Sequence, residues 1–238
     1  MRCRVCVVTS CILPAIDVWN QIPVDEAVRI FDGKSVAVVG NAMSILKYSW
    51  GGEIDSCDIV VRMNSAIPTD AVSKSIGTKT NVLTLGRLFC YEDAKKAGID
   101  PSQIWWMKFG TETGTRELNK LLSCSPIGDS LVLTSEEIES PVKKGAGKSG
   151  STGARFAYIL TSMCSPKSVA LYGMDCFGAA PGGAVINWWR DRRIQEKRRA
   201  SHNGQGEFDF IKSRGFCIEG GKWVHTHHCR KENKVPVE

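Results

Sequence analysis

Short apolar runs, separated by longer amphipathic or polar segments, set the pattern of the chain. The clearest run covers residues 35–39, is mostly β-branched and stops at Gly40. An apolar run without polar alternation is typical of a strand that is buried on both faces of a parallel sheet. Further runs predict four more strands, at residues 58–63, 81–85, 104–109 and 131–134.

Helical patterns lie between these runs. Residues 19–31 place Val24, Val28 and Phe31 on one face and two acidic residues in the first turn, which predicts a helix. Shorter helices are expected at residues 42–47, 89–97, 117–122 and 155–163. Because strands that alternate with helices form βαβ units, we predict an α/β fold with a Rossmann-like, mostly parallel sheet flanked by helices.

The length of the chain bounds its organisation. Its 238 residues are enough to bury one full core. We therefore predict a single domain over residues 1–238, with an N-terminal arm and helix at 1–33 and a tail at 226–238. No stretch approaches the roughly 20 apolar residues that a membrane-spanning helix needs. Residues 1–16 lack a convincing cleavage site, so no signal peptide is predicted.

Two asparagines follow consecutive predicted strands. Asn41 comes after the first strand and Asn64 after the second, so both reach the sheet edge where open α/β sheets bind ligands. The helix start after Gly40-Asn41 predicts an anion site beside them. Asparagine amides carry donors and acceptors that suit a pyrimidine edge or a phosphate oxygen, although each could simply cap a turn. An ordinary NAD site is excluded, because Gly40 does not open a G-x-G-x-x-G sequence.

A glycine-rich and lysine-rich stretch occupies residues 140–150. It resembles a phosphate-binding loop around Lys148, but such a loop needs a leading glycine directly after a strand, and Val142 stands at that position. We expect a flexible basic connector. Ser151, Thr152 and Gly153 follow and open the helix at 155–163; they either cap this helix or bind a phosphate at its start.

Charge and cysteine content narrow the class further. The formal charge of +6 fits an anionic substrate or a polyanionic partner, and equally an ordinary soluble protein. Ten cysteines are scattered, mostly within apolar runs, which predicts buried free thiols rather than a disulfide framework. The HTHHC sequence at 225–229 lacks the ligand spacing of a zinc finger, so no metal site is predicted.

Four sequence blocks appear in the order of a known family. They are VAVVGN, EIDSCDIVVRMN, STGARFAYILTSMCSPKSVALYGMD and the pair formed by His202 and Glu207, which are separated by four residues. The set resembles the sialylmotifs of the animal-type sialyltransferases, glycosyltransferase family 29. The resemblance implies a variant of the glycosyltransferase A-type fold. It also implies inverting transfer of a sialic acid or similar sugar acid from a CMP-sugar donor to a hydroxyl of a glycan or other acceptor, without metal or cofactor.

The resemblance also assigns roles to residues. His202 would be the general base, which its near-neutral unperturbed pKa suits, and Glu207 would support the structure around it. The positions expected to bind the donor are Gly40, Asn41, Asn64, Ser151, Thr152, Gly153, Gly173, Asn187 and Arg190.

The chain departs from the family pattern at two places. Val36 stands where the family has a cysteine that pairs with the one matched by Cys164, so that bridge is absent. Together with the missing membrane anchor, this predicts a cytoplasmic enzyme. Asn187-Trp188 replaces a His-Tyr pair, which makes Arg190 or Arg193 a candidate for the lost phosphate contact.

Two other functions remain open on sequence grounds. A phosphotransferase that resembles a P-loop protein would use Lys148 and require magnesium and ATP. A non-catalytic nucleic-acid-binding protein would use the basic run at residues 190–200, with binding that falls steeply with salt.

Overall fold

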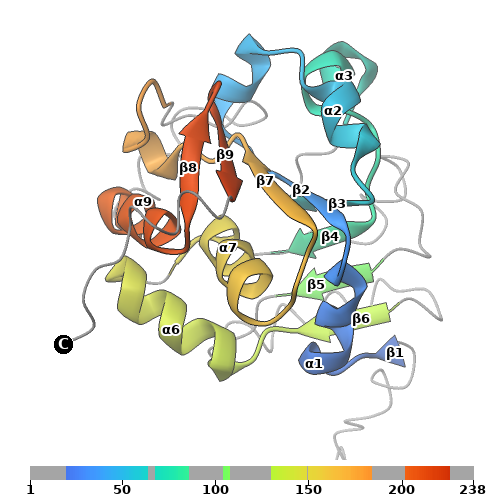
Figure 1. Ribbon diagram of the computed structural model, residues 1–238, viewed down its shortest axis with the longest axis vertical. Coiled ribbons are helices and arrows are strands. Elements are labelled where there is room, and N and C mark those ends of the chain that lie inside the picture. Colours follow the sequence, from blue (N-terminus) through green and yellow to red (C-terminus); the bar gives the residue numbers. More distant parts are fainter. Residues whose placement is uncertain are drawn as a thin grey trace, which may run out of the picture.

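A central nine-stranded sheet organises the described part of the chain. The computed structural model describes residues 20–63, 68–85, 104–107, 130–148, 150–183 and 202–225. Within these ranges the strands follow the order β1-β6-β5-β4-β3-β2-β7-β9-β8 (Figure 1). The strand bounds are β1 Asn20–Gln21, β2 Ser35–Val39, β3 Ile59–Met63, β4 Val82–Leu85, β5 Ile104–Met107, β6 Ser130–Leu133, β7 Ser168–Tyr172, β8 Phe216–Glu219 and β9 Lys222–His225.

The sheet is parallel except at one edge. The pairs from β1 to β7 are all parallel, whereas β9 runs antiparallel to both β7 and β8. The predicted Rossmann-like α/β fold is therefore confirmed. Strand β2 lies between β3 and β7, so its end at Val39 opens onto the middle of the carboxyl edge.

Alternate residues of β2 enter two separate cores. Val36 and Val38 pack into the larger core, while Ala37 and Val39 pack into the smaller one on the opposite face. These four side chains are at most 3% exposed. This explains the continuous apolar run, because a strand covered on both faces has no polar side to present.

Helices cover both faces of the sheet. The larger core is covered by α1 (Val24–Ala27) with η2 (Val28–Phe31), α6 (Glu136–Ala146), α7 (Thr152–Ser162) and α9 (Gly204–Ser213). The smaller core is covered by η3 (Met43–Lys47), α2 (Gly51–Ser56) and α3 (Asp70–Ile76). Figure 1 shows α6, α7 and α9 grouped on one side of the strands and α2 with α3 on the other.

The helix predicted at residues 19–31 begins later than expected. Asn20–Gln21 form β1, and α1 starts only at Val24 before it continues as the 3₁₀ helix η2. Pro23 explains the late start, because proline pushes its preceding residue towards extended backbone. The predicted apolar face is present: Val28 and Phe31 are buried.

The flexible connector expected at 140–150 is wrong for residues 140–146. These residues form the C-terminal part of helix α6. Three glutamates lie in the first turn, and Ile138, Val142 and Ala146 bury one face. Pro141 inside the helix costs about 3 kcal/mol, but burying Ile138 and Val142 contributes about 1.5–3 kcal/mol each. The free energy gained by burying Ile138 and Val142 therefore exceeds the cost of Pro141.

The described cysteines correct one expectation. Cys57, Cys164 and Cys176 are free thiols, as predicted, but Cys217 is disulfide-bonded. Burial raises the pKa of Cys164 to about 12, so this thiol stays protonated and inert at neutral pH.

Several predictions fall outside the described residues. These are the arm before residue 20, the helices at 89–97 and 117–122, the basic run at 190–200 and the tail at 226–238. Among the helices that the structure does describe, none has the length and apolar character needed to cross a membrane.

Candidate functional site

The ends of β2 and β7 approach each other closely at the carboxyl edge. Gly40 donates its N–H to the Tyr172 carbonyl over 2.7 Å, and a Cβ on Gly40 would lie 2.4 Å from the Gly173 carbonyl oxygen. Gly173 itself has φ +59°, in the left-handed region that favours glycine. The two glycines are therefore required by backbone packing, which leaves no space for a side chain between the strand ends.

The start of α7 joins this junction through Met174. A Cβ on Gly153 would lie 2.5 Å from Met174 Sδ, and one on Gly40 would lie 3.0 Å from the same atom. The loop after β2 and the N-terminus of α7 are thus neighbours, separated by one methionine side chain. No pattern in the sequence singled out Met174.

Some of the first N–H groups of α7 donate hydrogen bonds within the helix and others do not. Ser151 is the N-cap: its Oγ accepts from the Ala154 N–H, and its carbonyl accepts from the Arg155 N–H. The capping role expected for Ser151 is therefore present. Helix geometry gives the N–H groups of Thr152 and Gly153 no intrahelical acceptor, and they lie at the positive end of an eleven-residue helix. In proteins, such a helix N-terminus is a position that favours negative charge.

The helix expected after Asn41 does not provide a matching anion site. Residues Met43–Lys47 form only a five-residue 3₁₀ helix, and the Ala42 N–H already donates to the Gly173 carbonyl. So short a helix has a weak dipole, and one of its leading donors is used for packing. Of the two predicted helix starts, the one at α7 belongs to the longer helix and therefore has the stronger dipole.

Asn41 has one polar side-chain atom that is hydrogen-bonded and one that is not. Its Nδ2 donates to the Met63 carbonyl over 3.3 Å, whereas its buried Oδ1 has no hydrogen-bond partner. A buried unsatisfied carbonyl is costly, and a ligand N–H or O–H would satisfy it. Asn64, Asn187 and Arg190 lie outside the described residues.

One carboxylate oxygen connects α7 to the predicted base. Glu207 Oε1 accepts from the Ser151 N–H over 2.9 Å and lies 3.1 Å from His202 Nδ1. Because an ionised carboxylate oxygen can only accept, we assign the ring proton to Nδ1, which leaves Nε2 without a proton in the neutral imidazole. Glu207 is 2% exposed and His202 is 23% exposed, so the imidazole stands between the buried carboxylate and solvent.

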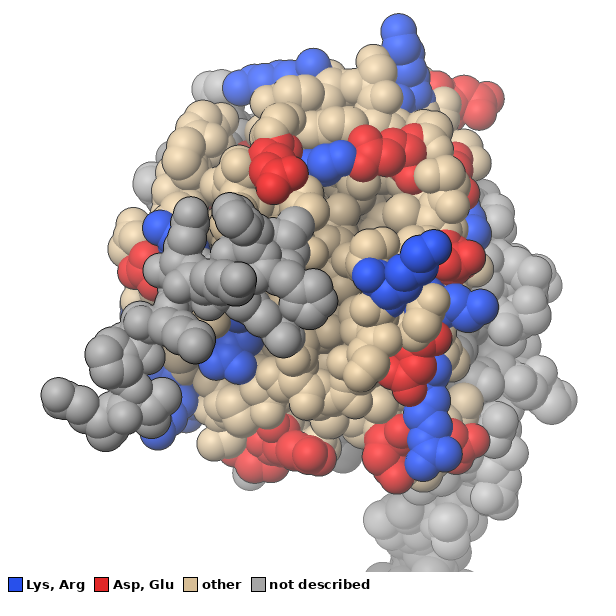
Figure 2. Space-filling view, viewed as in Figure 1, with Lys and Arg blue, Asp and Glu red and all other residues tan. Residues whose placement is uncertain are grey.

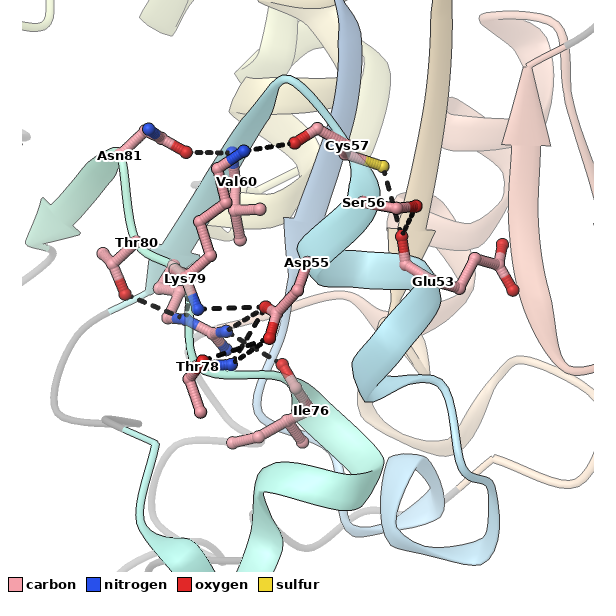
Figure 3. A network of polar contacts seen from close by, with 11 residues as sticks. Glu53, Asp55, Ser56, Cys57, Val60, Ile76, Thr78, Lys79, Thr80 and Asn81 are labelled. Carbon is pink, nitrogen blue, oxygen red and sulfur yellow. Dashed lines mark hydrogen bonds and ion pairs between the residues drawn. The ribbon is translucent and has the colours of Figure 1, made fainter.

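A buried arginine on β3, Arg62, binds the turn between α3 and β4. Arg62, 1% exposed, donates to the carbonyls of Ile76 and Lys79 and to Thr80 Oγ1 over 2.9–3.0 Å. Asp55, 3.9 Å from Arg62 Nη2, accepts from the backbone N–H groups of Thr78 and Lys79 (Figure 3). Burial lowers the pKa of Arg62 to about 10, so the guanidinium remains charged at neutral pH.

Both residues belong to the EIDSCDIVVRMN block, and their role here is structural. Asp55 binds the turn between α3 and β4 to α2, and Arg62 binds the same turn to β3. The sequence indicated a motif at this place but gave no sign that its arginine is buried.

Comparisons with known proteins agree with this architecture. A crystal structure of a mammalian sialyltransferase in complex with Gal-beta-1-3GalNAc-ortho-nitrophenol matches with a TM-score of 0.54 and 20% identity, over 75% of this chain and 64% of that chain. A second crystal structure of a mammalian sialyltransferase matches with the same TM-score and 21% identity. The described sheet and helices thus have the Rossmann-like fold of the sialyltransferases.

Sequence comparison finds partial matches to one family. Residues 22–93 match the model of glycosyltransferase family 29 (sialyltransferase). Human alpha-2,8-sialyltransferase 8F is 36% identical over 69 residues, which are 29% of this chain and 17% of that protein. The Mus musculus CMP-N-acetylneuraminate-beta-galactosamide-alpha-2,3-sialyltransferase 1 is 26% identical over 76% of this chain and 56% of that protein. Over these residues the chain is similar to sialyltransferases.

The sequence matches cover only some of the residues that form the candidate site. The chain spans 17% and 56% of the length of these two curated relatives. The family model covers β2, β3 and the Arg62 network, whereas α7, His202 and Glu207 lie beyond residue 93. Roles for these later residues therefore depend on their geometry.

Proposed function

We propose that the chain is a single glycosyltransferase domain that moves a sialic acid, or a similar sugar acid, from a CMP-sugar to an acceptor hydroxyl. The observation that carries the proposal is the shared Glu207 carboxylate, which joins the N-terminus of α7 to the His202 imidazole. A site for an anionic leaving group and a general base are thereby held together.

The proposed reaction is one inverting displacement. His202 Nε2 takes the proton of the acceptor hydroxyl as its oxygen bonds to the anomeric carbon, while the bond from that carbon to the CMP phosphate oxygen breaks. The N–H groups of Thr152 and Gly153 stabilise the charge that develops on the phosphate. Since backbone donors take this role, the proposal expects turnover to persist in EDTA.

The proposal also assigns the nucleotide. The unpaired Oδ1 of Asn41 accepts a hydrogen bond from an amino or hydroxyl group of the cytidine, and the close packing of Gly40 on Gly173 holds Asn41 at the carboxyl edge. Asn64, Asn187 and Arg190 complete the donor site in this proposal.

Calorimetric titration tests the donor class directly. The protein is expected to bind CMP at least tenfold more tightly than UMP, GMP or AMP, and to release CMP from CMP-sialic acid in the presence of a glycan acceptor. Equal affinity for all four nucleotides, or no heat with CMP, would contradict the proposal.

Asn41→Asp is expected to weaken CMP binding by at least tenfold. Aspartate cannot donate to the Met63 carbonyl, and it adds a negative charge near the leaving phosphate. Asn81→Asp is the matched control, because Asn81 uses only its Oδ1, which accepts from the Val60 N–H, and aspartate retains that acceptor. Unchanged CMP affinity in Asn41→Asp would remove this residue from the site.

The described residues disfavour the two other functions. Gly147 and Lys148 follow helix α6, not a strand, so the strand-to-loop geometry of a P-loop is absent there. Basic and acidic side chains alternate over the described surface in Figure 2, without a continuous basic patch on that face. The basic run at 190–200 is outside the described ranges.

Two cysteine observations favour different compartments. Val36, in place of the family cysteine, fits the proposed cytoplasmic location, whereas the disulfide at Cys217 fits an oxidising compartment. Thiol labelling of the protein in its own cells distinguishes them, because a cytoplasmic enzyme is expected to keep Cys217 reduced and reactive.

A further inference from the structure

Two consecutive residues after β7 adopt a backbone conformation that is rare in residues other than glycine. Cys176 has φ +47° and Phe177 has φ +55°, in the left-handed region. This conformation is disfavoured for every residue other than glycine, because the Cβ atom comes too close to the following carbonyl oxygen. Such outliers persist where the surrounding structure enforces them, and they gather at functional sites.

Three elements enforce this turn. Ser44 Oγ, on η3, donates to Asp175 Oδ1 over 2.7 Å, and both residues are buried. Trp223 Nε1, on β9, donates to the Met174 carbonyl over 2.8 Å. At the start of α9, a Cβ on Gly204 would lie 2.5 Å from the Cys176 carbonyl oxygen. The turn is thus fixed from both sides of the sheet.

The turn presents one aromatic ring to the predicted base. Phe177 stacks on the His202 imidazole with ring centroids 4.5 Å apart and planes 17° from parallel. Glu207 holds the edge of the same imidazole through Nδ1. The hydrogen bond fixes which nitrogen faces inward, and the phenyl ring fixes the plane, so the half-buried imidazole has one orientation.

We propose that Phe177 is a positioning residue that holds the His202 imidazole in the plane from which Nε2 faces the acceptor hydroxyl. The catalytic consequence rests on the proposed function, but the positioning itself is a property of the protein without substrate. The backbone strain at Cys176 and Phe177 is then explained, because an extended turn would carry the phenyl ring away from His202.

Three variants at this position separate the ring from the backbone strain. Phe177→Ala and Phe177→Gly both remove the ring, but glycine adopts φ +55° without strain, so the glycine variant is expected to have the higher Tm of the two. Phe177→Tyr keeps the ring. Tyr158→Ala is the matched control, since it removes a half-buried ring on α7 that contacts Arg214.

Kinetics and NMR provide the two measurements. Both ring deletions are expected to lower kcat by about 10–100-fold with the donor KM within twofold, because a misplaced catalytic group loses rate rather than ground-state binding. Phe177→Tyr restores kcat. In the ligand-free protein the His202 ring protons lose their ring-current shift in both deletions and keep it in Tyr158→Ala.

The outcomes are distinguishable from those of the proposed function. Wild-type protein without transferase activity refutes the proposed function, and the His202 resonances still decide the positioning. Ring deletions that leave these resonances unshifted overturn the inference. It is also overturned if kcat recovers in Phe177→Gly along with the Tm, since the ring would then act on stability alone.

Discussion

His202→Gln is expected to lower kcat for sialic acid transfer by about 10²–10⁴-fold, the usual contribution of a positioned general base. Glutamine keeps a polar side chain of similar reach but takes no proton at neutral pH. CMP affinity is expected to stay within twofold, because the proposal assigns the phosphate to the N–H groups of Thr152 and Gly153 and not to the imidazole. Steady-state kinetics and calorimetry with CMP measure the two quantities.

His225→Gln is the control for this prediction, because His225 lies on β9 at the far end of the hairpin. It is expected to keep the wild-type kcat. A His202→Gln enzyme with full transfer rate would show that another group takes the acceptor proton.

Glu207→Gln extends the test to the carboxylate. The double variant with His202→Gln is expected to be no slower than His202→Gln alone, since Glu207 acts on the reaction through the imidazole. Additive losses would indicate an independent role for the carboxylate.

Arg62→Met is expected to lower the free energy of unfolding by about 3 kcal/mol, the largest stability effect that we anticipate. Methionine fills much of the buried volume but donates no hydrogen bond, so the carbonyls of Ile76 and Lys79 lose their partner inside the protein. Hydrogen bonds from charged groups contribute about 1.5–3 kcal/mol each, and the added apolar burial recovers part of the loss. Urea unfolding measures the change.

Lys167→Met is the matched control, because it removes an exposed cation. It is expected to change the free energy of unfolding by less than about 0.5 kcal/mol. An equally small effect in Arg62→Met would mean that the turn between α3 and β4 keeps its structure without the guanidinium.

The strands could be predicted from the sequence because burial on both faces leaves a pattern in the chain itself. The predicted run at 35–39 is β2, and three further predictions match β3, β4 and β6 to within one residue at each end. Helix α6 could not be predicted, because its evidence is tertiary. Ile138 and Val142 are buried against other elements, and only that burial offsets Pro141.

The site shows the same division. Motif and order in the sequence indicated five residues, and the structure brings the elements that carry them together at one edge of the sheet. These residues are Gly40, Asn41, Ser151, His202 and Glu207. Met174 and Phe177 carried no signal, since an unremarkable side chain in a left-handed turn is not visible in sequence.

By itself, the sequence determined the parallel α/β sheet, the family likeness and the residue types available for chemistry, because these depend on local apolar patterns and on short motifs. The tertiary structure alone decided which donors remain free at the start of α7, which way Asn41 faces, and how His202 is held. Those properties depend on contacts between different parts of the chain, from Asn41 with Met63, 22 positions apart, to Ser151 with Glu207, 56 positions apart, and no local pattern in the chain encodes them.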